Sequence, residues 1–262
     1  MQKYLRIYHI LLRLNFSALV TYRTNFFNAV IGSFVWGVFS MVSVLLLTSR
    51  TPFLFGWKRE EIVLLTGVYS LFIGIFHFAF SRNFERIPIY VRLGTLDAML
   101  LKPLDTQFFV SIFLINFASI IRIIIGSLVI WYLLAQTQTL VTISSIILFL
   151  LFLSAGIVLL YSLWFMVTTI TIWYPDLSNI VEFLFSFSNV GRYPREMFAR
   201  VNRFVFFFLL PLTFIVETPL KGLLDKLAPL EIGGLIGFAS LFFLISRIFW
   251  KFALRHYTSA SS

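Results

Sequence analysis

Cysteine is absent from this 262-residue chain, and charged residues are scarce at 12% of the composition. Without cysteine, the chain forms no disulfide, no thiolate nucleophile and no cysteine-ligated metal site. Soluble domains typically carry about 25% charged residues, and half that supply cannot cover a globule in water. The composition therefore argues against a soluble enzyme or a soluble nucleic-acid-binding protein.

The residue clusters of membrane enzymes and ATPases are also missing. The three histidines stand far apart, no HExxH or paired-acid spacing occurs, and no Gly-Lys dipeptide supports a phosphate-binding loop. Ion-coupled carriers usually place acids at mid-membrane, whereas here Glu182 is the one acid inside an apolar piece. We therefore expect no catalytic residue, no metal and no cofactor on this chain, and an energy source in a partner.

Long apolar stretches dominate what is present, with 60% hydrophobic residues and 33 phenylalanines. A membrane crossing needs about 20 apolar residues. Five stretches qualify: 26–47, 62–80, 108–134, 143–173 and 230–250. Tryptophans stand near their ends, as interfacial aromatics do. The chain is predicted to be an all-α polytopic membrane protein that forms one transmembrane domain over 1–262.

The first 25 residues resemble neither a signal peptide nor a crossing, because three charged or titratable residues interrupt the apolar run. Polar residues recur every three or four positions and so share one face of a helix. They are Gln2, Arg6, His9, Arg13, Ser17, Thr21 and Thr24. This pattern predicts an amphipathic helix over 1–25 that lies in the membrane interface.

The region 176–228 holds two shorter apolar pieces, and their lengths leave its topology open. One covers 177–191 and contains Glu182, and the other covers 204–216 and contains Pro211. Pieces of this length often form re-entrant segments. We expect one piece to cross, giving six spans with both termini on one side, and the other to dip in and return.

Lysine and arginine counts predict which side carries the termini. Eleven of them flank the span ends on the side of the termini, whereas three lie in the opposite loops 48–61 and 135–142. Positive residues concentrate in the cytoplasm, so both termini are predicted to be cytoplasmic. Four further arginines lie within 192–203. Charge counting alone would keep them inside and make 204–216 the fifth span.

Small and polar residues on the spans predict close helix packing. Gly67, Ser70, Gly74 and His77 are spaced for one face of the span 62–80. Gly233 and Gly237 form a GxxxG pair in the last span, a weak signal for a self-contact.

One charge lies deep in a clear span. Arg122 shares a side of its helix with Asn116, Ser119 and Gly126. A charge there costs at least about 2.5 kcal/mol and should face the bundle interior or a wet cavity. It would either line a translocation path or pair within the membrane with a group such as Glu182.

The stretch between the second and third spans carries a specific motif. It reads Arg-Ile-Pro-Ile-Tyr-Val-Arg-Leu-Gly-Thr-Leu-Asp-Ala-Met-Leu-Leu-Lys-Pro-Leu over 86–104. This resembles the Gly-x-Leu-Asp-x-x-Leu-x-[Lys/Arg]-Pro element of ABC-2 type permeases, the membrane subunits of ATP-binding-cassette exporters. The order of elements resembles that family over nearly the whole chain, and the prolines at 175, 194 and 211 follow its pattern more loosely.

The resemblance implies a fold with an amino-terminal interface helix, six spans, a cytoplasmic coupling helix within 82–105 and an external re-entrant helical hairpin over 192–228. It makes 177–191 the fifth span, against the charge count. It also implies that the connector docks on a cytoplasmic ATPase. The coupling residues expected on that basis are Arg86, Arg92, Gly94, Leu96, Asp97, Lys102 and Pro103.

The function implied is that of a permease subunit of an ABC exporter in the cell (inner) membrane. Two permease copies, or a permease and a related one, would form the path, and separate ATPase subunits would bind ATP and Mg. The chain itself would not be an enzyme and would not bind nucleic acid. The alternative is a secondary carrier or membrane scaffold that works without an ATPase. The transported substrate cannot be read from the residues.

Overall fold

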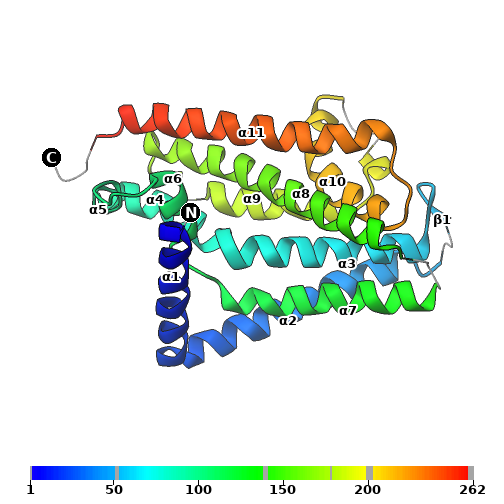
Figure 1. Cartoon of the computed structure of the whole chain (residues 1–262). Coiled ribbons are helices and arrows are strands. Elements are labelled where there is room, and N and C mark those ends of the chain that lie inside the picture. Colours follow the sequence, from blue (N-terminus) through cyan, green and yellow to red (C-terminus); the bar gives the residue numbers. More distant parts are fainter. Residues whose placement is uncertain (1, 51–52, 138–140, 178, 199–202, 259–262) are drawn as a thin grey trace.

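The computed structural model describes residues 2–50, 53–137, 141–177, 179–198 and 203–258. Figure 1 shows long helices running side by side, with one helix crossing an end of the bundle. In the described residues, five helical segments are long and apolar enough to span a membrane: Arg23–Leu47, Arg59–Arg92, Phe117–Gln136, Ile143–Ile172 and Glu231–Arg255. The chain is therefore an all-α polytopic membrane protein, as its composition predicted. The sixth crossing and the external re-entrant hairpin stay predictions.

The helices follow in chain order as α1 (Gln2–Thr21), α2 (Arg23–Leu47), α3 (Arg59–Phe76), α4 (Arg82–Arg92), α5 (Leu96–Leu100), α6 (Thr106–Ile112), α7 (Ile120–Gln136), α8 (Ile143–Thr169), α9 (Ile180–Ser188), α10 (Arg203–Leu223) and α11 (Pro229–Arg255). A short antiparallel pair, β1 (Phe53–Leu54) and β2 (Trp57–Lys58), precedes α3. Both termini, α4 and α5 lie at one end of the bundle, which we call the connector end. The strands lie at the opposite end, the hairpin end (Figure 1).

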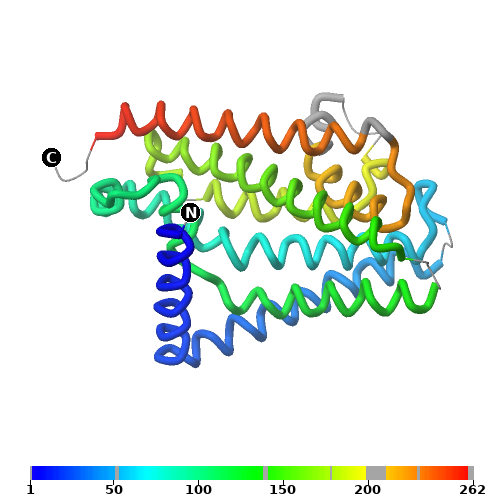
Figure 2. Tube along the Cα trace, in the orientation of Figure 1, coloured from blue at the N-terminus to red at the C-terminus, as the bar shows by residue number. Residues whose placement is uncertain are grey.

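Helix α1 lies across the connector end instead of along the bundle (Figure 2). It ends at Thr21, and α2 begins at Arg23, so the helix predicted over 1–25 is shorter than expected. Most of its side chains are exposed and only Leu11 is buried. An amphipathic helix in this position suits the membrane interface.

Helix α3 forms the centre of the bundle, with thirteen of its residues buried. Its closest neighbour is α7. A Cβ on Gly126 of α7 would stand 2.4 Å from the backbone nitrogen of Leu71 and 2.7 Å from the oxygen of Gly67. The Ser70 hydroxyl donates to the backbone oxygen of Arg122 at 3.2 Å. Gly67 and Gly74 also face α7, so small residues permit the close approach of the two backbones.

The Gly233 and Gly237 pair lies elsewhere. A Cβ on either glycine meets no other atom within 4 Å, and both positions are exposed on α11. This pair therefore packs against no helix in the described part of the same chain.

The span expected over 108–134 is not one helix, which corrects the sequence-based boundary. Helix α6 ends at Ile112, and the helical path resumes at Phe117. The side chain of Asn83 binds both backbone groups of Leu114, accepting from its N–H at 2.7 Å and donating to its carbonyl at 2.8 Å. Asn15 of α1 donates to the Phe113 carbonyl at 3.0 Å and accepts from the Ile115 N–H at 3.2 Å. These bonds satisfy backbone groups that a continuous helix would satisfy itself.

The segment from 180 to 198 runs along α3 from the connector end to the hairpin end. Phe185 packs edge-on against His77 with ring centroids 4.9 Å apart. The Tyr69 hydroxyl bonds to Oδ1 of Asn189 at 3.1 Å, and the indole N–H of Trp57 donates to Glu196 at 3.0 Å. As the segment advances, its partners on the α3 side move toward the hairpin end.

Candidate functional site

The connector begins where α4 stops. Gly94 takes a φ of +68°, a conformation that side chains disfavour, and thereby turns the chain from α4 into α5. Helix α5 is a single five-residue helix. It lies at the connector end, clear of the long helices (Figure 1). This is the position in which the sequence motif places a coupling helix.

The expected coupling residues do not all face outward. Arg92, Lys102 and Pro103 are exposed, whereas the Leu96 side chain is fully buried at 0% exposure and anchors the connector. The leucines of the connector do not share one apolar face, because Leu96 packs into the bundle core whereas Leu93 and Leu101 are exposed. Leu93 and Leu101 are 64% and 84% exposed, and with Arg92 and Lys102 they form the outer surface of the connector.

Asp97 points toward the carboxyl-terminal tail instead. Burial and the neighbouring Asp97 carboxylate raise the pKa of Tyr257 to about 12. The ammonium of Lys3 donates to the Pro103 carbonyl at 2.9 Å. Both terminal segments therefore touch the connector. Arg86 lies earlier, on α4, and lines a cavity between α4 and α1.

A second polar feature lies inside the bundle. Arg122 lines a cavity of about 300 Å³ between α2, α3, α7 and α9. The other lining residues are Trp36, Tyr69, Ile73, His77, Phe185 and Asn189. Because a charge among spanning helices is costly, its placement against polar groups and a cavity is what the sequence led us to expect.

The structure does not bring Arg122 and Glu182 together as an ion pair. Glu182 is exposed, and the ion pairs within the described residues include neither residue. Arg192, one of the four arginines of 192–203, is a second cation that lies among the helices. Its guanidinium reaches Ser40 of α2 at 3.5 Å and stacks on Tyr193, and its Nε is buried without a described hydrogen-bond partner.

Comparison with known families decides the identity. The family described as ABC-2 family transporter protein matches residues 34–261, from the middle of α2 to the carboxyl-terminal tail. The chain belongs to this family. No curated protein and no solved structure gives a significant match. Membership makes the chain a multi-pass membrane permease of the ABC-2 type.

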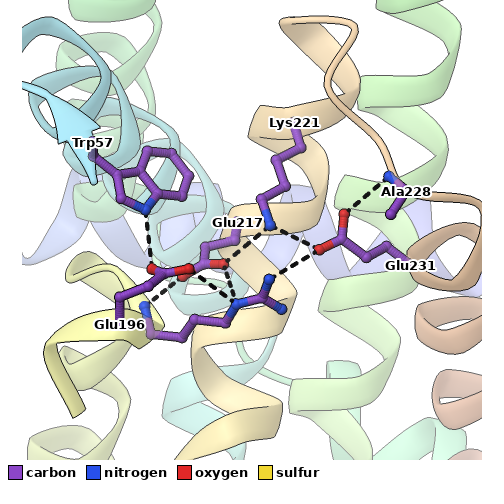
Figure 3. A network of polar contacts seen from close by, with 7 residues as sticks. Trp57, Glu196, Glu217, Lys221, Ala228 and Glu231 are labelled. Atoms are coloured by element: carbon purple, nitrogen blue, oxygen red, sulfur yellow. Dashed lines mark hydrogen bonds and ion pairs between the residues drawn. The ribbon is translucent and has the colours of Figure 1, made fainter. Parts of the chain in front are cut away.

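An ionic network that we did not predict lies at the hairpin end of this ABC-2 family protein (Figure 3). Arg195 approaches three carboxylates, those of Glu196, Glu217 and Glu231, at 3.3–3.5 Å. Lys221 lies 2.7 Å from Glu231 and 3.7 Å from Glu217. The network joins the segment after α9 to α10 and α11.

This network explains part of the discordant charge count in 192–203. The charge of Arg195 is balanced by three acids, and Arg192 reaches into the bundle, so neither is a free loop cation. Arg200 lies outside the described residues. Sequence spacing could not predict the network, because its members lie up to 36 positions apart along the chain.

Proposed function

We propose that this ABC-2 family protein is the permease subunit of an ATP-driven exporter. Two copies, or this chain and a related permease, would form the translocation path. Separate cytoplasmic ATPase subunits, which bind ATP and Mg, would supply the energy. The protein would sit in the cell (inner) membrane with both termini in the cytoplasm, in accord with the positive-inside count.

The observation that carries this proposal is the outer surface of the connector. Leu93 and Leu101 expose large apolar side chains at the end where the termini lie, flanked by Arg92 and Lys102. Apolar anchors with a charged rim are typical of protein interfaces. Leu96 fixes the connector to the bundle core, so movement of a docked partner would be transmitted to α4 and α3.

We assign the cavity around Arg122 to the translocation path. Arg122 and Arg192 both lie beside Tyr69 among spanning elements, and α2, α3, α7 and α9 line the cavity. We propose that 177–191 makes the fifth crossing and that 192–228 is the external re-entrant part. The course of 180–198 along α3 supports this choice over a crossing by 204–216.

Co-purification tests the partner. The chain is expressed with its neighbouring genes and purified in mild detergent, and a nucleotide-binding subunit is expected to accompany it. The double variant Leu93→Ser/Leu101→Ser should lose that subunit, while Ala98→Ser, at an exposed position of α5 between the two leucines, should keep it. Transport by the wild-type chain alone in ATP-free vesicles would contradict the proposal and support a secondary carrier.

Cysteine labelling tests the topology. Phe198→Cys introduces the only cysteine of the chain, close to Glu196 and the hairpin end. An impermeant maleimide added from outside is expected to label it. Labelling only after permeabilisation would place this segment in the cytoplasm and make 204–216 the fifth span.

A further inference from the structure

A cavity at the connector end is built differently from the path around Arg122. It encloses about 530 Å³ between α1, the start of α2, α4 and the break in the third span. Its charged residues are Arg82, Glu85 and Arg86, which lie three and four positions apart on α4 and so share one face. Cavities of this volume are within the usual range for small-molecule sites, about 300–1,000 Å³.

The depth of this cavity corresponds to the lipid headgroups. Helices α3 and α4 form one helical segment from Arg59 to Arg92. At 1.5 Å per residue, Arg82 lies about 34 Å from Arg59, just beyond a hydrocarbon core of about 30 Å. The amphipathic helix α1 forms another wall and lies across the same end. Two independent features thus place the cavity at the membrane interface.

The charges of the cavity are available to a ligand. Within the described residues, no ion pair involves Arg82, Glu85 or Arg86, although all three line one space. All three residues are also exposed to solvent. Two guanidinium groups beside one carboxylate match a ligand that carries a phosphate next to a cation.

The remaining walls suit the rest of a lipid. Asn25 and Tyr22 contribute polar groups, whereas Leu19, Phe26 and Phe117 contribute apolar surface. Asn15 also lines the cavity, but its amide is engaged by the backbone of the break. A lipid whose headgroup lies at the charged end of the cavity would therefore place its acyl chains against these apolar side chains.

We propose that this cavity binds the headgroup of an aminophospholipid, with Arg82 and Arg86 on the phosphate and Glu85 on the primary ammonium. This site is independent of the ATPase and of the path around Arg122. It assigns Arg86 to lipid binding, although the sequence motif placed it among the coupling residues. A bound lipid would also brace α1 against α4.

Native mass spectrometry of the purified chain, titrated with defined lipids, tests the proposal. Phosphatidylethanolamine should bind best, because phosphatidylglycerol lacks the cation and phosphatidylcholine has no N–H to donate to Glu85. Arg82→Gln/Arg86→Gln should weaken binding of phosphatidylethanolamine roughly tenfold or more. The control Arg6→Gln/Arg13→Gln removes the same charge from exposed positions of α1 outside the cavity and should bind as the wild type.

Two further variants keep the test decisive if the arginine variant does not fold. Glu85→Gln should abolish the preference for phosphatidylethanolamine over phosphatidylglycerol while retaining phosphate binding. Ala18→Phe keeps every charge but fills the cavity, and it should weaken both lipids.

Three outcomes would overturn the proposal. The first is an equal loss of binding in the control variant, which would show attraction to the surface alone. The second is equal affinity for the three lipids with no effect of Glu85→Gln. The third is that soluble phosphoethanolamine competes as strongly as the lipid, which would make a free phosphate compound the ligand.

Discussion

The side-chain amide of Asn83 binds both backbone groups of Leu114, at 2.7 and 2.8 Å, across 31 positions of sequence. Asn83 lies at the start of α4, with 1% of its surface exposed, and Leu114 lies in the break between α6 and α7. The bond pair replaces the helical bonds that Leu114 lacks and ties the start of α4 to the third span.

Replacing Asn83 by alanine should therefore destabilise the fold. Two buried backbone groups lose their partners, at about 1–3 kcal/mol each, so we expect the free energy of unfolding to fall by about 2–6 kcal/mol. Thermal unfolding in detergent measures the effect as a lower Tm. Asn28→Ala, an exposed position on α2, is the control and should leave Tm within a degree or two. Equal Tm values for both variants would show that the break needs no support from Asn83.

Glycine substitutions should separate internal packing from the outer surface of α11. Gly126→Ala should lower Tm strongly, because the new Cβ would stand 2.4 Å from the backbone of Leu71 and force α3 and α7 apart. Gly233→Ala meets open space and should leave the monomer as stable or raise its free energy of unfolding by up to about 1 kcal/mol through helix propensity.

The same pair of variants also reports on self-association. If Gly233→Ala lowers the dimer fraction in size-exclusion chromatography while Tm is kept, the glycine pair belongs to the interface between permeases. A fall in Tm with Gly233→Ala as large as that with Gly126→Ala would refute the assignment of Gly233 to the outer surface of α11.

Stability should depend on pH through Glu217. Burial raises the pKa of this carboxyl from its ordinary value of 4.5 to about 7, against the opposing effects of the Arg195 N–H and the nearby cations. A raised pKa means that the folded state favours the protonated form. This contribution to stability is complete below about pH 4.5 and is lost as the pH rises through about 7.

Between pH 5 and pH 8, we therefore expect the wild-type protein to lose roughly 2–3 kcal/mol through this group. Glu217→Gln should flatten the pH profile of Tm over this range. Glu60→Gln, at an exposed carboxylate of α3, should keep the wild-type slope. An unchanged slope in Glu217→Gln would assign the pH dependence to other groups.

The start of α6 should depend on Asp105 in two separable ways. Its Oδ1 accepts from the Phe108 N–H at 2.9 Å as a helix cap, and Arg247 of α11 binds both carboxylate oxygens. The Arg247 guanidinium holds the pKa of Asp105 below its ordinary value. Asp105→Asn keeps a capping oxygen and should cost about 1 kcal/mol for the partly exposed ion pair.

Asp105→Ala removes the cap as well and should cost about 1 kcal/mol more. Chemical denaturation of both variants measures the difference. The single variant Arg247→Gln leaves the Asp105 cap intact and measures the contribution of the ion pair alone. Equal losses for the asparagine and alanine variants would show that the cap adds nothing.

Local patterns determined much of this fold. The lengths of apolar runs predicted the long helices, because a crossing needs a fixed number of apolar residues whatever its neighbours are. The polar stripe of 1–25 predicted the interfacial helix, and the family resemblance of the motif around Gly94 and Asp97 implied a short helix in the connector. Gly67 and Gly74 indicated a packing face, though not which helix would occupy it.

Tertiary structure decided what depends on partners far along the chain. The third span breaks where Asn15 and Asn83 satisfy its backbone, and no local pattern in 113–116 reveals those partners. Arg195 approaches three acids, two of them on α10 and α11, and a count of lysines and arginines along the chain does not reveal such partners. Arg86 lines a cavity under α1, a placement that sequence spacing on α4 could not supply. Hydrophobic length is a property of a segment, whereas the neutralisation of a charge or a free backbone group is a property of the assembled fold.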